Sequence, residues 1–209
     1  AIPAFDFFMA KGVAKSFRKH LSSFINFYVA MENGIQADEK AIRTLIKEYL
    51  PSIQSGERER ETLRIALIAL QIIIDKEHLT RIAEKAYQQT KKDTHQAMEG
   101  FIHNLNTMHS RAGAQTPFSS INYGMDTSPE GRMVMKNLLL ATEAGLGDGE
   151  TPIFPVQIFK VKEGVNYNEG DPNYDLFRHA LRCSAKRLFP NFSFLDAPFN
   201  LQYYKPGRP

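Results

Sequence analysis

The chain has 209 residues, 43% of them hydrophobic and 11% aromatic, with 26 Lys and Arg against 23 Asp and Glu. This length suffices for a substantial core, and no apolar run approaches the ~18 residues that a membrane-spanning helix needs. The net charge of +3 is too small to indicate a nucleic-acid-binding surface by itself. Because Cys183 is the single cysteine, an internal disulfide and a four-cysteine zinc site are excluded within the chain, and we expect a cytoplasmic protein.

Both ends of the sequence indicate a segment of a longer polypeptide. The first residues, AIPAFDFF, contain neither an initiator Met nor a secretory signal. The last residues, YYKPGRP, form a loop-like Pro/Gly run. We therefore expect an internal fragment.

The amino-terminal half is predicted to be helical. Apolar residues recur at spacings of three and four, and Pro3 and Pro51 are the only prolines before Pro117. One short helix is predicted over residues 38–49, and at least one long helix over residues 57–92, where LRIALIALQIII would be buried by neighbours or by another subunit. A further helix carries one apolar side, made of Met98, Phe101, Ile102, Leu105 and Met108.

After Gln115 the pattern changes to strand, helix, strand, helix, strand. The predicted strands are TPFSSINY, PIFPVQIFKV and FSFLDAPF, although Pro155 indicates an edge or a bulge in the second. Ser128 before Pro129 and Asp171 before Pro172 mark helix starts, and the second of these helices would run to about Leu188. Strands joined by helices of this length normally lie parallel with right-handed crossovers, so the class is α/β.

The segment HSRAGAQTPFSSINYG places small and polar residues where a core strand would normally be apolar. Side chains alternate along a strand, so Ser120 and Asn122 share one face while Ser119, Ile121 and Tyr123 share the other. An edge strand, or hydroxyls bonded to nearby backbone, explains this pattern as well as a ligand-facing strand does.

Long runs of this sequence resemble the anaerobic (class III) ribonucleoside-triphosphate reductases, which are glycyl radical enzymes. The resemblance is dense over residues 93–207, and its specific motifs are SRAGAQ, FSSINYG and FPNFSFLDAPFN. It implies that residues 1–114 form a mainly helical part, with the dimer and effector region, and residues 115–209 a β/α part of one β/α barrel, without a separate domain boundary.

The resemblance also implies the reaction. Family members reduce ribonucleoside triphosphates to deoxyribonucleoside triphosphates without oxygen, usually with formate, and act as homodimers. A radical S-adenosylmethionine activase installs a glycyl radical that oxidises a cysteine to a thiyl, and zinc is held in the carboxyl-terminal region. Those cysteines and that glycine fall outside this chain, and Cys183 lacks the catalytic context, so we expect a buried structural thiol and an inactive isolated chain. The alternative is a non-catalytic nucleotide-binding or dimerisation module from a split or degenerate reductase.

Two nucleotide sites are predicted on this basis. Substrate contacts are expected from Arg111, whose guanidinium suits phosphate but could equally pair with a carboxylate, and from Ser119, Ser120 and Asn122. A deoxynucleoside triphosphate effector is expected at Asp6, Lys11, Lys15 and Arg18, beside Lys19; a solvated basic helix face is the equal alternative. The resemblance places the ATP effector of the family in a separate domain outside this chain. Neither membrane nor direct nucleic-acid binding is expected.

Two other patterns favour structural roles. His95, Glu99 and His103 are spaced by four on one helix, but no fourth metal ligand accompanies them, so a polar surface is expected and no metal. The helix start after Ser128 is an anion site in principle, yet Asp126 and Glu130 already satisfy such an end.

Overall fold

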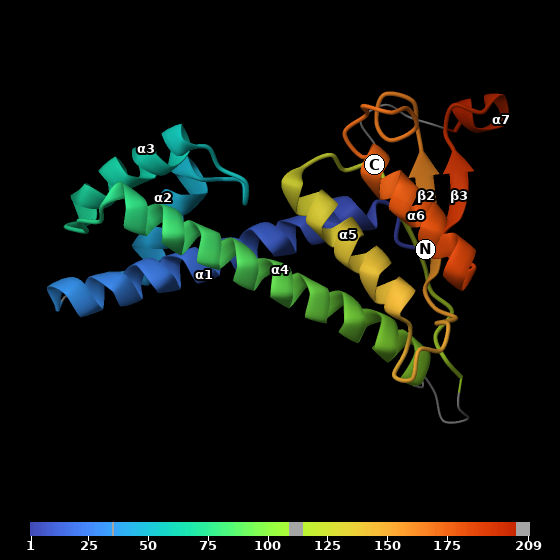
Figure 1. Cartoon of the computed structure of the whole chain (residues 1–209), viewed down its shortest axis with the longest axis horizontal. Coiled ribbons are helices and arrows are strands. Elements are labelled where there is room, and N and C mark those ends of the chain that lie inside the picture. Colours follow the sequence, from blue (N-terminus) through green and yellow to red (C-terminus); the bar gives the residue numbers. More distant parts are fainter. Residues whose placement is uncertain (35, 109–114, 204–209) are drawn as a thin grey trace. The chain divides into compact units, whose positions relative to one another are not determined.

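The computed structural model describes residues 1–34, 36–108 and 115–203. The chain divides into two compact units, one of residues 11–93 and the other of residues 1–10 with 94–209. Two long helices, α1 (Phe5–Asn33) and α4 (Lys76–Thr107), belong partly to each unit (Figure 1). The sequence predicts that a helical part ends and a β/α part begins at residue 114. This residue lies within residues 109–114, which are outside the described residues.

The first unit, residues 11–93, is entirely helical where it is described. Every fourth residue of this part of α1 is buried at 5% exposure or less, since that spacing keeps one side of a helix against the core: Val13, Phe17, Leu21, Ile25 and Val29. The predicted helix at 38–49 is confirmed as α2 (Glu39–Tyr49), where the Asp38 side chain accepts a hydrogen bond from the Lys40 amide. Pro51 follows the end of this helix closely.

The apolar stretch LRIALIALQIII does not form one continuous helix. The helix α3 (Glu57–Leu67) passes into a 3₁₀ turn, η1 (Ile68–Leu70), and Gln71 takes a left-handed conformation at φ 60° before α4 begins. Leu63, Leu67, Ile72 and Ile74 are buried, whereas Ile65, Ile68 and Ile73 are more than half exposed. Neighbours within the described part of the chain therefore bury only some of this stretch, and burial of the other residues by another subunit stays a prediction.

The second unit has the predicted α/β order. Its three strands are β1 (Ser120–Tyr123), β2 (Val156–Val161) and β3 (Asn191–Phe194), which form a parallel sheet in the order β1-β2-β3. The connecting helices are α5 (Pro129–Ala144) and α6 (Tyr174–Arg187) (Figure 1). Ser128 caps α5 as predicted, because its Oγ accepts a hydrogen bond from the Gly131 amide at 3.1 Å.

All three strands are shorter than the sequence predicted. β2 begins only after Pro155, since a proline has no amide to donate to the ladder. The third strand ends at Phe194, and Pro198 opens a short helix, α7 (Pro198–Leu201), where the prediction extended the strand.

One face of the sheet packs against α5 and α6. Tyr123 on β1 and Phe159 on β2 are fully buried, and the ring of Phe159 stacks on Phe177 of α6 with centroids 6.1 Å apart. The Tyr123 hydroxyl donates to Gln157 Oε1, and Gln157 in turn donates to Thr142 of α5. These buried polar groups are thus paired, as low-dielectric surroundings require.

The sequence pattern predicts one apolar side of α6, made of Phe177, Ala180, Leu181, Ser184 and Leu188, and the buried side differs from this set. Leu176, Phe177, Ala180 and Cys183 face the core, whereas Leu181 and Leu188 are exposed at 46% and 80%. Among the described helices, none combines the length and the apolar character needed to span a bilayer.

The amino terminus is tied to β1 within this unit. The Ile2 amide donates to the Ser120 carbonyl, and the Asn122 amide donates to the Ile2 carbonyl. Four residues on, Asp6 is fully buried, and its Oδ2 accepts hydrogen bonds from the amides of Gly124, Met125 and Asp126 at 3.0 Å each. Burial raises the pKa of the Asp6 carboxyl, and these backbone hydrogen bonds oppose the shift.

Replacing Asp6 by Ala should strongly destabilise the chain. The change leaves three amides without their acceptor in a buried loop, and each orphaned donor costs roughly 1–3 kcal/mol, so we expect a loss of about 3 kcal/mol in the free energy of unfolding. Urea unfolding followed by circular dichroism measures it. Asp148→Ala, at an exposed position, is the control; equal stability of the two variants would contradict the anchoring role.

Candidate functional site

The sheet face away from α5 and α6 carries Ser120 and Asn122 of the segment SSIN. The strand register places Ser120 opposite Val156, Asn122 opposite Ile158, and Lys160 opposite Ser193. Since side chains of paired residues in a parallel sheet point the same way, these six share one face. All six are half-buried, while their strand neighbours Ile121, Tyr123, Phe159 and Val161 are fully buried on the other side. We call Ser120, Asn122, Val156, Ile158, Lys160 and Ser193 the half-buried face.

Polar atoms at this strand lack hydrogen-bond partners among the described residues. Asn122 Oδ1, on the half-buried face, is shielded from solvent and accepts no hydrogen bond. Ser119 Oγ is also buried and without a partner among these residues. Side-chain alternation places it on the same side as Ile121, toward the helices. Because nearly all buried polar groups in native proteins are paired, an orphaned amide oxygen beside a polar face indicates a missing partner such as a ligand.

A frame of hydrogen bonds fixes the carboxyl ends of β1 and β2 beside that face. The Asn166 amide group donates to the carbonyls of Gly124 and Lys160, and Asn173 donates to those of Gly124 and Asp126. Gly124 has φ 122°, and a Cβ there would lie 2.6 Å from the Lys160 carbonyl oxygen. Only glycine fits this position, so the chain can turn sharply where β1 ends.

Sequence reasoning missed Asn166, Asn173 and Lys160. The two asparagines lie in the loop VNYNEGDPNY, whose composition indicates turns but no particular contact. Lys160 is one cation in a predicted strand, and only the register shows that it shares a face with Asn122. From the sequence alone, strand alternation could have placed Lys160 on the same side of its strand as Val156 and Ile158, but not beside Asn122.

Of the predicted substrate residues, Ser120 and Asn122 lie together on the half-buried face, and Ser119 lies on the opposite side. Arg111 lies outside the described residues, as do His109 and Gly113. Its prediction as a phosphate contact stays a prediction.

The predicted effector residues belong to different units. Asp6 belongs to the α/β unit, where its carboxylate is fully buried and occupied by three amides, so no side of it is accessible to a nucleotide. We therefore correct its assignment to a structural anchor. Lys11, Lys15 and Arg18 belong to the helical unit on α1; the two lysines are exposed and Arg18 is half-buried.

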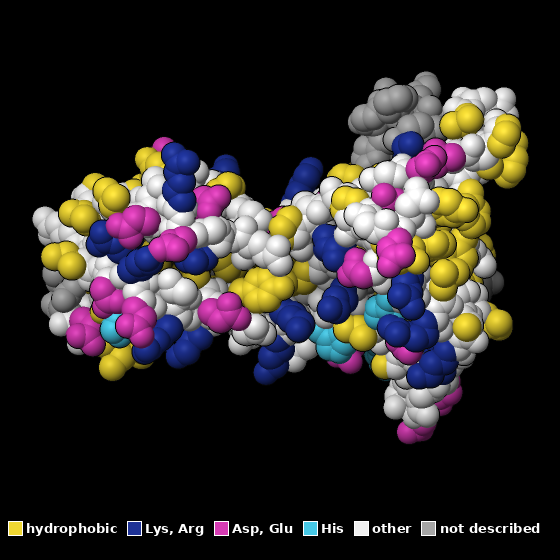
Figure 2. Space-filling model, turned by 45° about the horizontal axis from the view of Figure 1, so that its top comes forward, with side chains coloured by type: hydrophobic (Ala, Val, Ile, Leu, Met, Phe, Trp, Pro, Cys, Tyr) yellow, Lys and Arg dark blue, Asp and Glu magenta, His cyan; other side chains and the backbone are white. Residues whose placement is uncertain are grey.

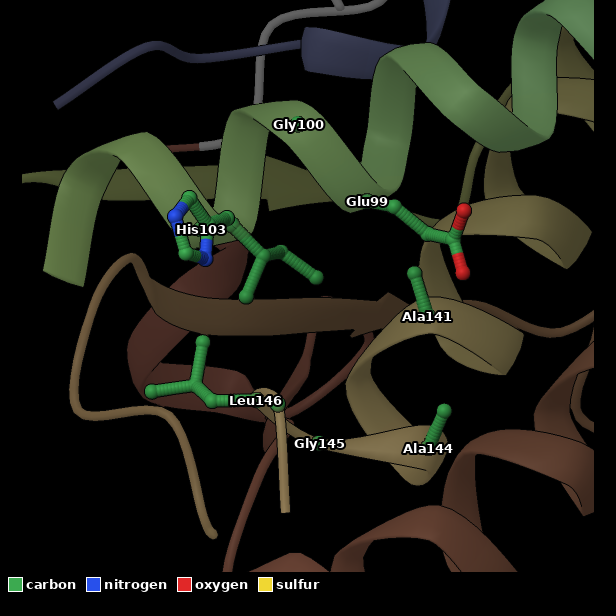
Figure 3. Close-up of a pocket in the computed structure, with 9 residues that line it drawn as sticks. Glu99, Gly100, His103, Ala141, Ala144, Gly145 and Leu146 are labelled. Carbon is green, nitrogen blue, oxygen red and sulfur yellow. The ribbon is translucent and has the colours of Figure 1, made fainter. Parts of the chain in front are cut away.

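In the row of His95, Glu99 and His103, the last two residues line a cavity of about 470 Å³ in the α/β unit. Glu99 and His103 project from α4 toward Ala141, Ala144 and the turn that follows α5 (Figure 3). His95 Nε2 lies 3.3 Å from Glu99 Oε1, so these two residues pair with each other. Among the described residues, no group of three His, Cys, Asp or Glu side chains is arranged to hold a metal ion.

A comparison with protein families decides what this scaffold is. The family model for anaerobic ribonucleoside-triphosphate reductase matches residues 1–208. The chain belongs to this family.

Curated relatives agree with that assignment. The anaerobic ribonucleoside-triphosphate reductase of Escherichia coli K12 is 37% identical over 112 residues, and that of phage T4 is 43% identical over 107 residues. The Haemophilus influenzae enzyme is 38% identical over 107 residues. These alignments cover 51–53% of this chain but only 15–18% of the relatives, so the chain matches a small part of each reductase.

Cys183, the only cysteine of this reductase segment, is a core residue. It is fully buried on α6, and its Sγ lies 3.7 Å from the Leu139 carbonyl oxygen of α5. Burial raises the pKa of its thiol to about 11, with Glu143 contributing in the same direction. A thiol of this kind is neutral at pH 7 and inaccessible, which fits the expected structural role.

Cys183 should accordingly be inert in the folded chain. We expect no reaction with an aromatic disulfide reagent at pH 8 under native conditions, and reaction of one thiol per chain in 6 M urea, because only the accessible thiolate is nucleophilic. Absorbance of the released thiolate measures both. Rapid reaction of the native chain would show that α6 does not bury this residue.

Proposed function

We propose that this chain is a nucleotide-binding segment of an anaerobic ribonucleotide reductase. The complete enzyme would convert ribonucleoside triphosphates to deoxyribonucleoside triphosphates by glycyl and thiyl radical chemistry, with formate as the reductant. This proposal extends the family assignment to the activity that the matched relatives carry in their names.

The half-buried face carries the proposal. Ser120 and Asn122 offer a hydroxyl and an amide without charge, and Asn122 Oδ1 has no partner within residues 1–34, 36–108 and 115–203. Val156 and Ile158 lie beside them in register and supply apolar walls. Few polar groups within an otherwise apolar surface are typical of small-molecule sites, and in parallel sheets such sites lie toward the carboxyl ends of the strands. A ribose and its phosphates match this mixture of groups.

We further propose that the sheet continues into a barrel. β3 pairs only with β2 in the described part of the chain, which leaves its other edge without a strand. Hydrophobic side chains gather around β3 and α7 (Figure 2), and Phe199 and Tyr203 are 70% and 78% exposed. An unpaired edge flanked by exposed aromatic residues is a surface that further strands and helices normally cover.

Catalysis in this proposal depends on parts beyond these residues. Cys183 is fully buried, with its Sγ against the Leu139 carbonyl of α5, so it is unsuited to become a thiyl radical facing substrate. The thiyl cysteine, the radical glycine, the zinc site and the radical S-adenosylmethionine activase would come from the rest of the enzyme and its partner. We therefore propose that the 209-residue chain binds nucleotide but does not reduce it.

A regulatory role is proposed for α1. Lys11, Lys15 and Arg18 recur at spacings of four and three, so they lie along one side of the helix. Phe17 and Leu21 face the core from an adjacent side of the helix. A row of cations along a helix suits the phosphates of a deoxynucleoside triphosphate, and a homodimer formed through this unit would bring two such rows together.

Ribonucleotide binding at the half-buried face predicts a specific loss in Asn122→Leu. The substitution keeps the number and branching of the side-chain heavy atoms but removes both hydrogen-bonding groups, so we expect at least one ribonucleoside triphosphate to bind about tenfold more weakly. Calorimetric titration with each of the four ribonucleoside triphosphates tests this. Asn168→Leu, at an exposed loop position, is the matched control. If the unmodified chain binds none of the four, the proposed site is wrong.

Effector binding on α1 predicts that Lys15→Ala weakens deoxynucleoside triphosphate binding by about fivefold to tenfold, since one charge-assisted hydrogen bond is lost. Calorimetry with each deoxynucleoside triphosphate, together with mass measurement by light scattering, is the assay. Lys85→Ala removes an equally exposed lysine from α4 in the same unit. Equal affinities of the two variants would exclude Lys15 from the effector site.

A further inference from the structure

Lys160 is the one positively charged side chain of the half-buried face. It is the fifth residue of β2, opposite Ser193 of β3, and it lies two residues nearer the carboxyl end of the strand than Ile158, the partner of Asn122. Like Asn122 it is half-buried. The face therefore changes from neutral hydrogen-bonding groups at Ser120 and Asn122 to a cation at the carboxyl edge of the sheet.

Other cations close to this edge are already engaged. Lys162 Nζ lies 3.3 Å from Asp196 Oδ1, and the Arg132 guanidinium lies 2.9 Å from Asp175 Oδ2. Lys160 Nζ, in contrast, has neither an ion pair nor a hydrogen bond with any described residue, although its backbone carbonyl accepts from Asn166. Because the ammonium group of this half-buried residue has no counterion among the described residues, an anionic ligand would supply the missing charge.

The backbone around Lys160 is held firmly. Its carbonyl is fixed by Asn166, whose Oδ1 also accepts from the Lys162 amide, so the end of β2 is clamped on both sides of the residue. Gly124 at the end of β1 packs against the same carbonyl. The side chain therefore extends from a fixed point, which lowers the entropic cost of ordering it around a ligand.

We propose that Lys160 binds the phosphate groups of the ribonucleotide and thereby sets its direction on the sheet. The phosphates lie at the carboxyl edge, and the ribose hydroxyls lie over Asn122 and Ser120. The inference rests on the proposed function of the half-buried face and adds a residue and an orientation to it. A lysine suits this role because its ammonium group is a compact charge that meets several phosphate oxygens in turn.

The test uses the full 209-residue chain and the ribonucleoside triphosphate that it binds most tightly, with the corresponding monophosphate and nucleoside. We expect Lys160→Met to weaken triphosphate binding about tenfold or more, to weaken the monophosphate less, and to leave the nucleoside unchanged, because the lost interaction is with phosphate. Lys160→Arg should retain most of the affinity. Raising the salt concentration should weaken the unmodified chain more than Lys160→Met.

Lys136→Met is the matched control, since Lys136 is exposed on α5 and the same charge is removed. Thermal unfolding of each variant checks that the fold is kept. If Lys160→Met binds triphosphate as Lys136→Met does while Asn122→Leu binds weakly, the face is the site but Lys160 does not bind phosphate. If Lys160→Met weakens the nucleoside as much as the triphosphate, the residue acts through the fold and the inference is overturned. If the unmodified chain binds no ribonucleotide, the proposed function itself fails.

Discussion

The carboxylate of Asp6 is the constraint on which the α/β unit depends. It gathers three successive amides, and the furthest of them is 120 residues away in sequence. Removing a carboxylate from water is costly, and charge-assisted hydrogen bonds to backbone amides offset that cost only when several converge. The first turn of α1 is therefore joined to the loop at the end of β1, and this junction sets where the strand's last residues lie.

The two faces of the sheet beside this junction differ in burial and in hydrogen-bond pairing. The face toward α5 and α6 is an aromatic core in which Tyr123, Phe159 and Phe177 pack closely and the Tyr123 hydroxyl is paired with Gln157, while Ser119 Oγ has no partner among the described residues. The other face keeps a hydroxyl, an amide and a cation half-buried and incompletely paired. Stability resides on the first face, and the second tolerates unsatisfied groups, which is the usual arrangement at a site that waits for a ligand.

Membership of the reductase family fits a sheet with one core face and one half-buried polar face. The proposed reaction on a nucleotide would need a dry, polar-lined surface on a rigid scaffold, and the asparagine frame around Gly124 supplies rigidity at the strand ends. The helical unit offers a second surface of a different kind, with a row of cations along α1. Binding of substrate and binding of effector are thus proposed for separate compact units of the same chain.

Much of the local structure could be predicted from the sequence. Proline and cap residues gave the starts of α2 and α5, and period-two alternation separated Ser120 and Asn122 from Ile121, because these signals act within a few residues. Strand lengths were overestimated, since apolar β-type residues continue beyond the last ladder hydrogen bond. The stretch LRIALIALQIII fits the pattern of a long helix, because composition does not show the left-handed turn at Gln71 that interrupts it.

By itself, the sequence determined the α/β order of elements, the family resemblance and the polar character of β1, all of which follow from short motifs and periodicity. Only the tertiary structure decided that Asp6 is an anchor, that Asn122 Oδ1 has no partner, and that Lys160 shares its face. The physical reason is that burial and hydrogen-bond pairing depend on residues far apart in the chain, and register between strands is fixed by packing rather than by local preference.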